Sequence, residues 1–499
     1  MTGPVLVILP HNPGDVVMAL QAIRRVKARH PGLEVDYLVG EECRDLALGN
    51  PLLRKVFVIP KRDLKALWEG GDSEGVLARL GAFLAEMAAT RYALSANLFQ
   101  ERWGGLLQGM VNSDRKIGLE LAEASRFQVR SRWLEHLFAI PAHRAGNCLH
   151  VVDIYARAIS QALGGGSESS LRRAENAASL LPMLLRPNAC KNLAPETYLA
   201  FHPGSAWAGK RWPEAHWAGL ADRCAAAGFT LAFTGAPEDR PMMDRIAASL
   251  APRTRAALVD CVGRTSLPGA AWVYAHARML ISGDTVAMHL AAAAGIRTLS
   301  LFGASNPVET GPYGKGHVII QTDANPLPDL AFDSEHAGLR HLRAEEVAAY
   351  VLDGEPPPGF RMWETGWDES RKAQGLFDAQ RLPYPHPAIA LALARVLDAQ
   401  EALPGSPVPV DRPDGLRGRL RTCLDKCIGQ PLDENLAVLT AIEKELEEET
   451  RADLIWEAYR IAVNGLPWGD LRAHLILRKA RLESALEEEA LTRHADPIA

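Results

Sequence analysis

Four short segments of the chain combine glycine with a charged or hydroxyl side chain directly after an apolar run. The first is His11-Asn-Pro-Gly-Asp15, where Gly14 permits a tight turn and Asp15 falls at the start of a helical pattern. The Asp15 carboxylate has two interpretations. It can be an N-cap, worth about 1 kcal/mol to the helix, or a general base that takes a proton from a substrate hydroxyl. Position alone favours the cap, because aspartate is common where helices begin.

The second segment runs from Phe201-His-Pro-Gly-Ser205 through a loop of small residues to Lys210-Arg-Trp-Pro213. Proline at the first turn of the following helix is typical of helix N-termini. The hydroxyl of Ser205, the ammonium group of Lys210 and the amides of that N-terminus together suit a diphosphate. A Gly/Pro turn that carries an exposed lysine is the alternative interpretation.

The third segment, residues 233–239, ends a predicted strand and contains Glu238 and Asp239. Glu238 can accept hydrogen bonds from a ribose or a base, as acidic residues do in dinucleotide-binding folds. Capping of the following helix explains an acidic residue here equally well. The segment therefore predicts a nucleoside contact at Glu238 and leaves the capping alternative open.

The fourth segment is Ile281-Ser-Gly-Asp284-Thr285, which ends a strand and opens a helix over residues 286–294. Asp284, Thr285 and His289 are then expected around one helix N-terminus. That grouping suits a pyrophosphate and sugar hydroxyls, with helix amides holding the phosphate. A lone histidine one turn into a helix is usually structural, but these neighbours favour a binding role for His289.

Two series of alternating strand and helix patterns carry these segments. In the first series we predict strands at residues 5–9, 34–39, 55–59 and 92–96, with helices at 16–29 and 74–89. In the second series we predict strands at residues 198–202, 229–234, 257–260, 279–282 and 298–302, with helices at 213–227, 239–250, 267–276 and 344–352. The alternation predicts α/β architecture, with two Rossmann-like parallel sheets in tandem. In such folds ligands bind beyond the carboxyl ends of the strands, where all four segments fall.

Changes in composition divide the chain into four parts. We predict a Rossmann-like domain at residues 1–165, a linker at 166–196, a second Rossmann-like domain at 197–353 and an all-α extension at 354–499. The extension shows helical patterns at residues 387–400, 416–428, 435–449, 452–464 and 471–489, with almost no strand signal. Cys423 and Cys427 lie four apart on one of these helices, and packing explains them better than a metal, because no second ligand pair follows nearby.

Composition narrows the class of protein. With 499 residues, 47% of them hydrophobic, the chain is long enough for several cores. A net charge of -5 provides no global positive field, so nucleic acid is not an expected partner. The seven cysteines are odd in number and scattered, which predicts free thiols in a reducing compartment. The apolar run at residues 5–9 is too short to span a bilayer and lacks a basic leader, so we expect a cytoplasmic protein with at most peripheral contact at the inner membrane.

The joint order and spacing of these segments resemble the bacterial heptosyltransferases of glycosyltransferase family 9. The motifs that carry the resemblance in the second domain are His202-Pro-Gly-Ser205 with Lys210-Arg-Trp-Pro213, Gly263-Arg-Thr-Ser-Leu267, Gly283-Asp-Thr285 with His289-Leu-Ala-Ala, and Leu301-Phe-Gly303 with Thr310-Gly-Pro-Tyr-Gly314. Gly14-Asp-Val-Val17, Tyr37-Leu-Val and Arg115-Lys-Ile-Gly118 look like the family's acceptor domain, so the resemblance extends over residues 1–352.

The resemblance implies the GT-B fold, in which two Rossmann-like domains face a cleft, and an inverting transferase that uses an ADP-activated heptose or a related sugar nucleotide. It implies no catalytic metal. It also implies no cofactor, because the ADP-sugar is consumed as a co-substrate. Matched to the family motifs, Asp15 is the base, and the donor-binding residues are Ser205, Lys210, Glu238, Thr265, Asp284, Thr285 and His289. The implied acceptor is a glycolipid or glycan of lipopolysaccharide type, with a protein as the alternative.

Three features depart from the family pattern. Val286 adds a side chain where the family usually has glycine, and Leu9-Pro10-His11 replaces a basic residue that is common after the first strand. The residues after Pro356 have no counterpart in the usual family chain. These departures leave the transferred sugar and the acceptor open.

Two other classes of function compete with this interpretation. One is a GT-B relative with different chemistry, such as a sugar-nucleotide epimerase or a protein O-heptosyltransferase. The other is a degenerate transferase whose helical extension serves as an interaction module, although the presence of Asp15, Lys210 and His289 weighs against it. A dinucleotide oxidoreductase is disfavoured, because no G-x-G-x-x-G follows the first strand of either domain.

Overall fold

The computed structural model describes residues 3–121, 127–143, 147, 149–165, 181, 186–303, 305–322, 338–358 and 360–365. The chain divides into two compact units, residues 1–144 with 149–382 and residues 145–148 with 383–499. All but one of the described residues belong to the first unit. The helices predicted from residue 387 onward, Cys423 and Cys427 lie outside the described residues, as does most of the predicted linker.

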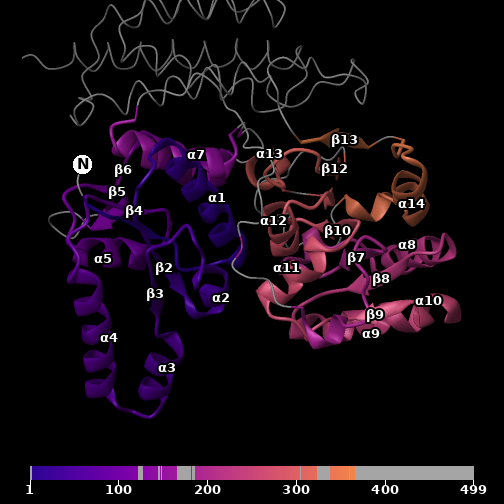
Figure 1. Ribbon diagram of the computed structural model, residues 1–499, viewed down its shortest axis with the longest axis horizontal. Helices are drawn as coiled ribbons and strands as arrows, with labels where there is room; N and C mark the ends of the chain where they lie inside the picture. The colour runs from indigo at the N-terminus through magenta and orange to yellow at the C-terminus, as the bar shows by residue number, and fades with distance from the viewer. Residues whose placement is uncertain are drawn as a thin grey trace, which may run out of the picture. The chain divides into compact units, whose positions relative to one another are not determined.

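The first unit contains two separate sheets, which define what we call the first half (residues 3–165) and the second half (residues 186–365) (Figure 1). The sheet of the first half has the strand order β3-β2-β1-β4-β5-β6. Its strands are β1 Val5–Ile8, β2 Val35–Gly40, β3 Lys55–Ile59, β4 Leu94–Asn97, β5 Lys116–Leu121 and β6 Phe127–Arg130. All neighbours pair in parallel except β5 and β6, which are antiparallel at the edge. Every residue of β1 is buried, as expected of a central strand covered on both faces.

The helices of the first half are α1 Pro13–Arg29, α2 Arg44–Ala47, α3 Lys61–Glu69, α4 Ser73–Ala88, α5 Arg102–Met110, α6 Arg132–His143 and α7 Val151–Ala162. The first of these, α1, packs against α7 of its own half and against α12 of the second half, residues Val286–Ala293. Nine of its residues between Val16 and Val26 are buried, because it is covered on several sides. This helix therefore links the functional segment after β1 to both halves.

The sheet of the second half has the strand order β13-β12-β11-β10-β7-β8-β9. Its strands are β7 Tyr198–His202, β8 Thr230–Phe233, β9 Leu258–Asp260, β10 Met279–Gly283, β11 Thr298–Phe302, β12 Val318–Gln321 and β13 Arg361–Glu364. Its other helices are α8 Glu214–Ala226, α9 Arg240–Ser249, α10 Pro252–Ala256, α11 Leu267–Ala275, α13 Pro307–Thr310 and α14 Ala344–Asp353. The carboxyl ends of β7 and β10, which are adjacent, carry two of the predicted ligand-binding segments.

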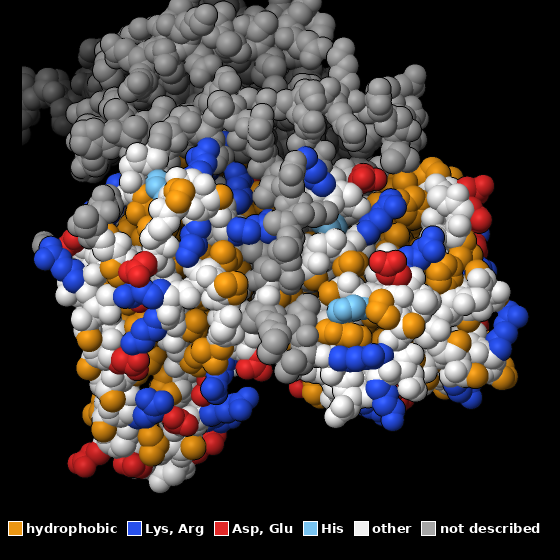
Figure 2. Space-filling view, in the orientation of Figure 1, with side chains coloured by type: hydrophobic (Ala, Val, Ile, Leu, Met, Phe, Trp, Pro, Cys, Tyr) orange, Lys and Arg blue, Asp and Glu red, His pale blue; other side chains and the backbone are white. Residues whose placement is uncertain are grey.

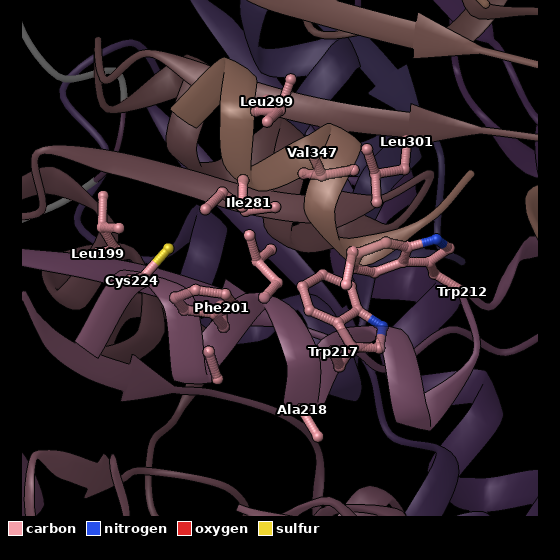
Figure 3. Packing of buried hydrophobic residues seen from close by; sticks show 14 of the residues in the cluster. Leu199, Phe201, Trp212, Trp217, Ala218, Cys224, Ile281, Leu299, Leu301 and Val347 are labelled. Atoms are coloured by element: carbon pink, nitrogen blue, oxygen red, sulfur yellow. The ribbon is translucent and has the colours of Figure 1, made fainter. Parts of the chain in front are cut away.

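Large aromatic side chains hold α8 and α14 against this second sheet. Phe201 stacks on Phe233 with ring centroids 5.0 Å apart, and Trp212 meets Trp217 edge to face at 5.1 Å (Figure 3). The Trp212 indole is buried but satisfied, because its Nε1 donates to the Leu342 carbonyl at 2.7 Å. This packing fixes the loop before α8, which contains Lys210.

The predicted strands and helices that fall on described residues agree with the structure to within one to three residues. Strands β5, β6, β12 and β13 were not predicted, nor were helices α3, α5, α6 and α7. Strand β13 lies beyond Gly354, where the sequence favoured helices alone. Residues 361–364 instead extend the second sheet by pairing with β12. A four-residue edge strand has too few positions for a clear alternating pattern, and its partner is remote in sequence.

Two further predictions concern thiols and membrane spans. The four described cysteines, Cys43, Cys190, Cys224 and Cys261, are buried and free, as predicted for them. Within the described ranges, no helix is long and apolar enough to cross a bilayer. Acidic and basic side chains are interspersed over the face of the first half shown in Figure 2.

Candidate active site

Asp15 is the third residue of α1, and Asn12 takes the N-cap position. The sequence-based N-cap interpretation of Asp15 is therefore wrong, because the helix begins at Pro13, two residues earlier. Asn12 has a positive φ of 59° and makes no capping bond through its side chain. Its Nδ2 instead donates to Asp15 Oδ2 at 3.0 Å. This leaves the Asp15 carboxylate in the first turn of the helix, without a capping role.

The electrostatic environment of Asp15 comes from both halves. Burial raises the pKa of Asp15 above its ordinary value of 3.8, while the hydrogen bond from Asn12 and the charge of Lys210 partly offset the rise. The charge of Asp284 adds to the rise. Because Lys210 and Asp284 belong to the second half, they must lie close to the start of α1. A carboxylate with a raised pKa accepts a proton more readily than an ordinary one.

Lys210 and Asp284 form a largely buried ion pair in the second half. Lys210 ends the short helix η5, Ala208–Lys210, between β7 and α8, and Asp284 follows β10. The Lys210 Nζ donates to Asp284 Oδ2 at 2.6 Å, and the two side chains are 19% and 6% exposed. Burial alone would raise the pKa of Asp284, but the nearby Lys210 lowers it below 3.8. The alternative of a turn with an exposed lysine does not hold.

His289 lies on α12 beside this pair and faces the start of α1. A Cβ atom built on Gly14 would lie 3.1 Å from His289 Cδ2, so the glycine allows close approach of the two helices. Burial lowers the pKa of His289 from 6.5 to about 4, with Asp284 opposing that shift. The imidazole is therefore neutral at pH 7. Its Nδ1 is buried and has no hydrogen-bond partner among the described residues.

The N-terminus of α12 is open to a ligand. Thr285 occupies the N-cap with an extended backbone, and within the described part of the chain its side chain makes no capping bond to the helix amides. Thr285 and Val286 are both half-buried. An uncapped helix N-terminus next to a lysine is suited to a phosphate group. Val286 thus adds a partly exposed side chain at this N-terminus.

Ser205 lies in the loop after β7 and is buried, with 9% of its surface exposed. Its carbonyl accepts a hydrogen bond from Arg211 Nε at 2.8 Å, which folds the loop back before Lys210. Ser205 and Lys210 are both in the segment between β7 and α8.

Glu238 and Thr265 lie on two loops that meet at Gly263. The Gly263 amide donates to the Gly235 carbonyl at 2.9 Å, and a Cβ atom on Gly263 would lie 3.1 Å from Pro237 Cα. Its φ of +67° and this close approach both favour glycine. Glu238 is exposed and Thr265 half-buried, so both remain accessible to a ligand. Asp239, rather than Glu238, makes the local capping contact, accepting from the Ala236 amide at 2.8 Å.

The structure thus places Asp15, Lys210, Asp284 and His289 close enough for their charges to interact. Thr285 follows Asp284 directly in the sequence. Glu238 and Thr265 form a second group on the meeting loops after β8 and β9. The sequence-based inference missed Asn12, the partner of Asp15, although it lies inside the segment that drew attention to Asp15. Its side-chain contact spans one helix turn and carries no spacing signal of its own.

Solved structures with the same two-sheet arrangement identify the class of fold. The E. coli heptosyltransferase WaaC with ADP aligns with a TM-score of 0.53 and 21% identity, covering 70% of this chain and 100% of that one. A glycosyltransferase family 9 structure from Veillonella parvula aligns with a TM-score of 0.54 and 19% identity, covering 70% of this chain and 97% of that one. The fold is the GT-B fold.

Sequence comparisons add the family to which the chain is similar. Residues 115–337 match the model of glycosyltransferase family 9 (heptosyltransferase). Lipopolysaccharide heptosyltransferase 1 of Pseudomonas aeruginosa is 29% identical over 333 residues, 65% of this chain and 86% of that protein. The E. coli K12 protein of the same name is 24% identical over 332 residues, 65% of this chain and 96% of that protein. These matches confirm the resemblance inferred from the sequence: the chain is a glycosyltransferase that is similar to the heptosyltransferases of family 9.

Proposed function

We propose that this chain transfers a heptose from an ADP-activated donor to a lipopolysaccharide-type acceptor, with inversion at the anomeric carbon and Asp15 as the general base. Relatives that carry the name lipopolysaccharide heptosyltransferase align with most of their own length, which supports this substrate class. Structures of WaaC with ADP and with ADP-2-deoxy-2-fluoro heptose support an ADP-linked donor. The observation that carries the proposal is the electrostatic coupling of Asp15 to the Lys210–Asp284 pair of the other half.

In the proposed reaction, the oxygen of an acceptor hydroxyl forms a bond to the anomeric carbon of the donor. The bond from that carbon to the diphosphate oxygen breaks, and its electron pair leaves with ADP. The hydroxyl proton passes to the Asp15 carboxylate, whose raised pKa suits it to the task. Attack from the face opposite the departing diphosphate inverts the anomeric configuration.

The second half supplies groups suited to the donor diphosphate. The Lys210 ammonium group carries the positive charge, and Asp284 orients it through a 2.6 Å hydrogen bond. The amides at the N-terminus of α12 add donors beside Thr285. Stabilisation of the leaving group by these fixed charges and dipoles replaces a bound divalent cation in the proposal, so metal independence remains a prediction.

Four further residues complete the proposed donor site: His289, whose imidazole is neutral, and Ser205, Glu238 and Thr265. The unpartnered Nδ1 of His289 is available to a hydroxyl or phosphate oxygen. Ser205 is on the Lys210 loop, where its hydroxyl suits the diphosphate. Glu238 and Thr265 lie on the two loops that meet at Gly263, which suits a nucleoside. The acceptor is proposed to approach from the side of the first half, where Asp15 and Asn12 lie.

The test is heptosyl transfer from ADP-heptose to lipopolysaccharide extracted from cells that make no heptose, followed by mass spectrometry of the product. We expect Asp15→Asn to lower kcat by about 10²–10⁴-fold, because it removes the proton acceptor. Its affinity for ADP, measured by calorimetry, should stay within about twofold of the unsubstituted protein.

Asp63→Asn is the matched control, because Asp63 is also a carboxylate in the first turn of a helix of the first half. It is exposed and paired with Arg79 on the surface, so its replacement should leave kcat unchanged. Equal kcat for Asp15→Asn and the unsubstituted protein would remove Asp15 from the mechanism. Absence of transfer by the unsubstituted protein, with ADP-heptose bound, would refute the acceptor class.

A further inference from the structure

A buried polar network joins the two halves near the C-terminal end of α1. Arg25 of α1 donates through Nη1 to Asp153 of α7 and, at 2.5 Å, to the Tyr313 hydroxyl of the second half. The Tyr313 hydroxyl in turn donates to Asp153 Oδ1 at 2.7 Å. The side chains of Arg25 and Asp153 are only 9% and 6% exposed. Tyr313 belongs to the segment Thr310-Gly-Pro-Tyr-Gly314 that the family resemblance includes, and the proposed function assigns it no role.

His150, the N-cap of α7, adds a second bond between the halves in the same place. Its Nδ1 accepts from the Val152 amide at 3.1 Å, so the proton of the neutral ring is on Nε2. Nε2 then donates to the Gly311 carbonyl at 2.9 Å. The His150 and Tyr313 rings lie 4.8 Å apart. The bond to Gly311 and the ring contact with Tyr313 link the start of α7 to the segment that follows α13 (Figure 1).

Helix α1 therefore touches the second half at two separate places. One is the packing of Gly14 on His289 at the start of the helix. The other is the Arg25 contact with Tyr313, which at 1.5 Å per residue lies about 16 Å further along the helix. Two separated contacts on a rigid helix restrict both its distance and its tilt relative to the second half. The position of Asp15, which is on this helix, is restricted with them.

We propose that Tyr313, with the Arg25–Asp153 pair, is a positioning residue that holds α1 so that Asp15 lies within reach of the donor site. The inference rests on the proposed function, because it gives Asp15 the role of base. Tyr313 does not act on the substrate itself. Its hydroxyl accepts from one residue of α1 and donates to one residue of α7, so it fixes two elements of the first half at once.

The test is Tyr313→Phe in the full chain, which removes the hydroxyl and keeps the ring. With ADP-heptose and heptose-free lipopolysaccharide, we expect kcat to fall about 10–100-fold, because small misplacement of a reacting group has effects of this size. The KM for ADP-heptose and the calorimetric affinity for ADP should stay within twofold, because the donor residues lie in the second half.

Tyr350→Phe is the matched control. The Tyr350 hydroxyl also accepts from an arginine, Arg297 at 3.0 Å, but both residues belong to the second half. Its removal should leave kcat unchanged. A second comparison places Tyr313→Phe in the Asp15→Asn protein, where it should cause no further loss of kcat if Tyr313 acts through Asp15.

These outcomes separate the positioning role from simple stabilisation and from the proposed function. A lower melting temperature for Tyr313→Phe with unchanged kcat would overturn the positioning role and leave the proposed function standing. A multiplicative loss in the double variant would also overturn it, because the two residues would then act independently. If the unsubstituted protein binds ADP-heptose and transfers nothing, the proposed function fails and the positioning role fails with it.

Discussion

The two halves hold their functional residues in different ways. In the second half, Lys210 and Asp284 are buried against each other at 2.6 Å, and each compensates the charge of the other. In the first half, Asp15 is half-buried, and its carboxylate accepts a hydrogen bond from exposed Asn12. The second half thus holds its charges in a preformed arrangement, whereas the environment of Asp15 depends on residues across from it. The difference indicates a rigid donor site and a base whose reactivity depends on the placement of α1.

The largest expected effect concerns the ion pair. Lys210→Ala leaves the Asp284 carboxylate buried without its partner, which should cost about 3 kcal/mol of stability. It should also weaken ADP binding at least about tenfold, because a charge-assisted contact to the diphosphate is lost. Thermal unfolding and calorimetry measure the two effects.

Removing both charges provides the control for this first prediction. Lys210→Ala combined with Asp284→Asn should regain part of the lost stability, because no unpaired charge remains. Arg245→Ala, which breaks the largely exposed pair with Glu214, should cost at most about 1 kcal/mol. Equal losses for Lys210→Ala and Arg245→Ala would contradict the preformed character of the donor site.

The next effect concerns pH and the buried histidines of the second half. Burial lowers the pKa of His289 from 6.5 to about 4, and the pKa of His202 likewise to about 4. The unfolded chain therefore binds more protons between these pH values, so stability falls as the pH is lowered from 6.5 to 4. Each histidine contributes at most about 3 kcal/mol to this fall.

Replacing one histidine tests that assignment. His289→Asn should make the melting temperature fall less steeply between pH 6.5 and 4 than in the unsubstituted protein. Identical slopes for the two proteins would show that burial of His289 does not set its protonation.

The smallest expected effect is that of Asp15→Asn on stability. It is opposite in sign to the effect of Lys210→Ala, which destabilises the protein. Because folding raises the pKa of Asp15, its ionised form opposes folding at pH 7 and its protonated form does not. Asp15→Asn should therefore raise the melting temperature at pH 7, by about 2 °C for an effect near 1 kcal/mol. The gain should shrink as the pH falls through the pKa of Asp15, because both proteins are then neutral at this position. A lower melting temperature for Asp15→Asn at pH 7 would contradict the conclusion that the charge of Asp15, unlike those of Lys210 and Asp284, is not compensated in the folded protein.

The four segments differ in how well their local structure followed from sequence. The strands that precede them were predicted to within one residue at each end, and Tyr198–His202 coincides with its prediction. Long apolar runs that end in glycine and polar residues leave little freedom in placing a buried parallel strand. The cap at Asp15 was predicted wrongly, because Pro13 starts the helix before the aspartate is reached.

The partners of the site residues did not follow from sequence. Lys210 and Asp284 are 74 residues apart, and nothing in their local spacing shows that β7 and β10 lie side by side. The same holds for Tyr313, whose partner Arg25 is 288 residues away in the other half. Edge strand β13 was missed for this reason as well, since β12 lies more than 35 residues before it.

The sequence alone determined the alternation of strands and helices, the glycine-containing segments at the strand ends and the resemblance to family 9. These are local properties, set by hydrophobic period and turn chemistry within a few residues. Only the tertiary structure decided which charges compensate each other, which imidazole is neutral and how α1 contacts the second half. Burial and Coulomb interactions depend on distances through space, and those distances exist only after the sheets and helices have packed.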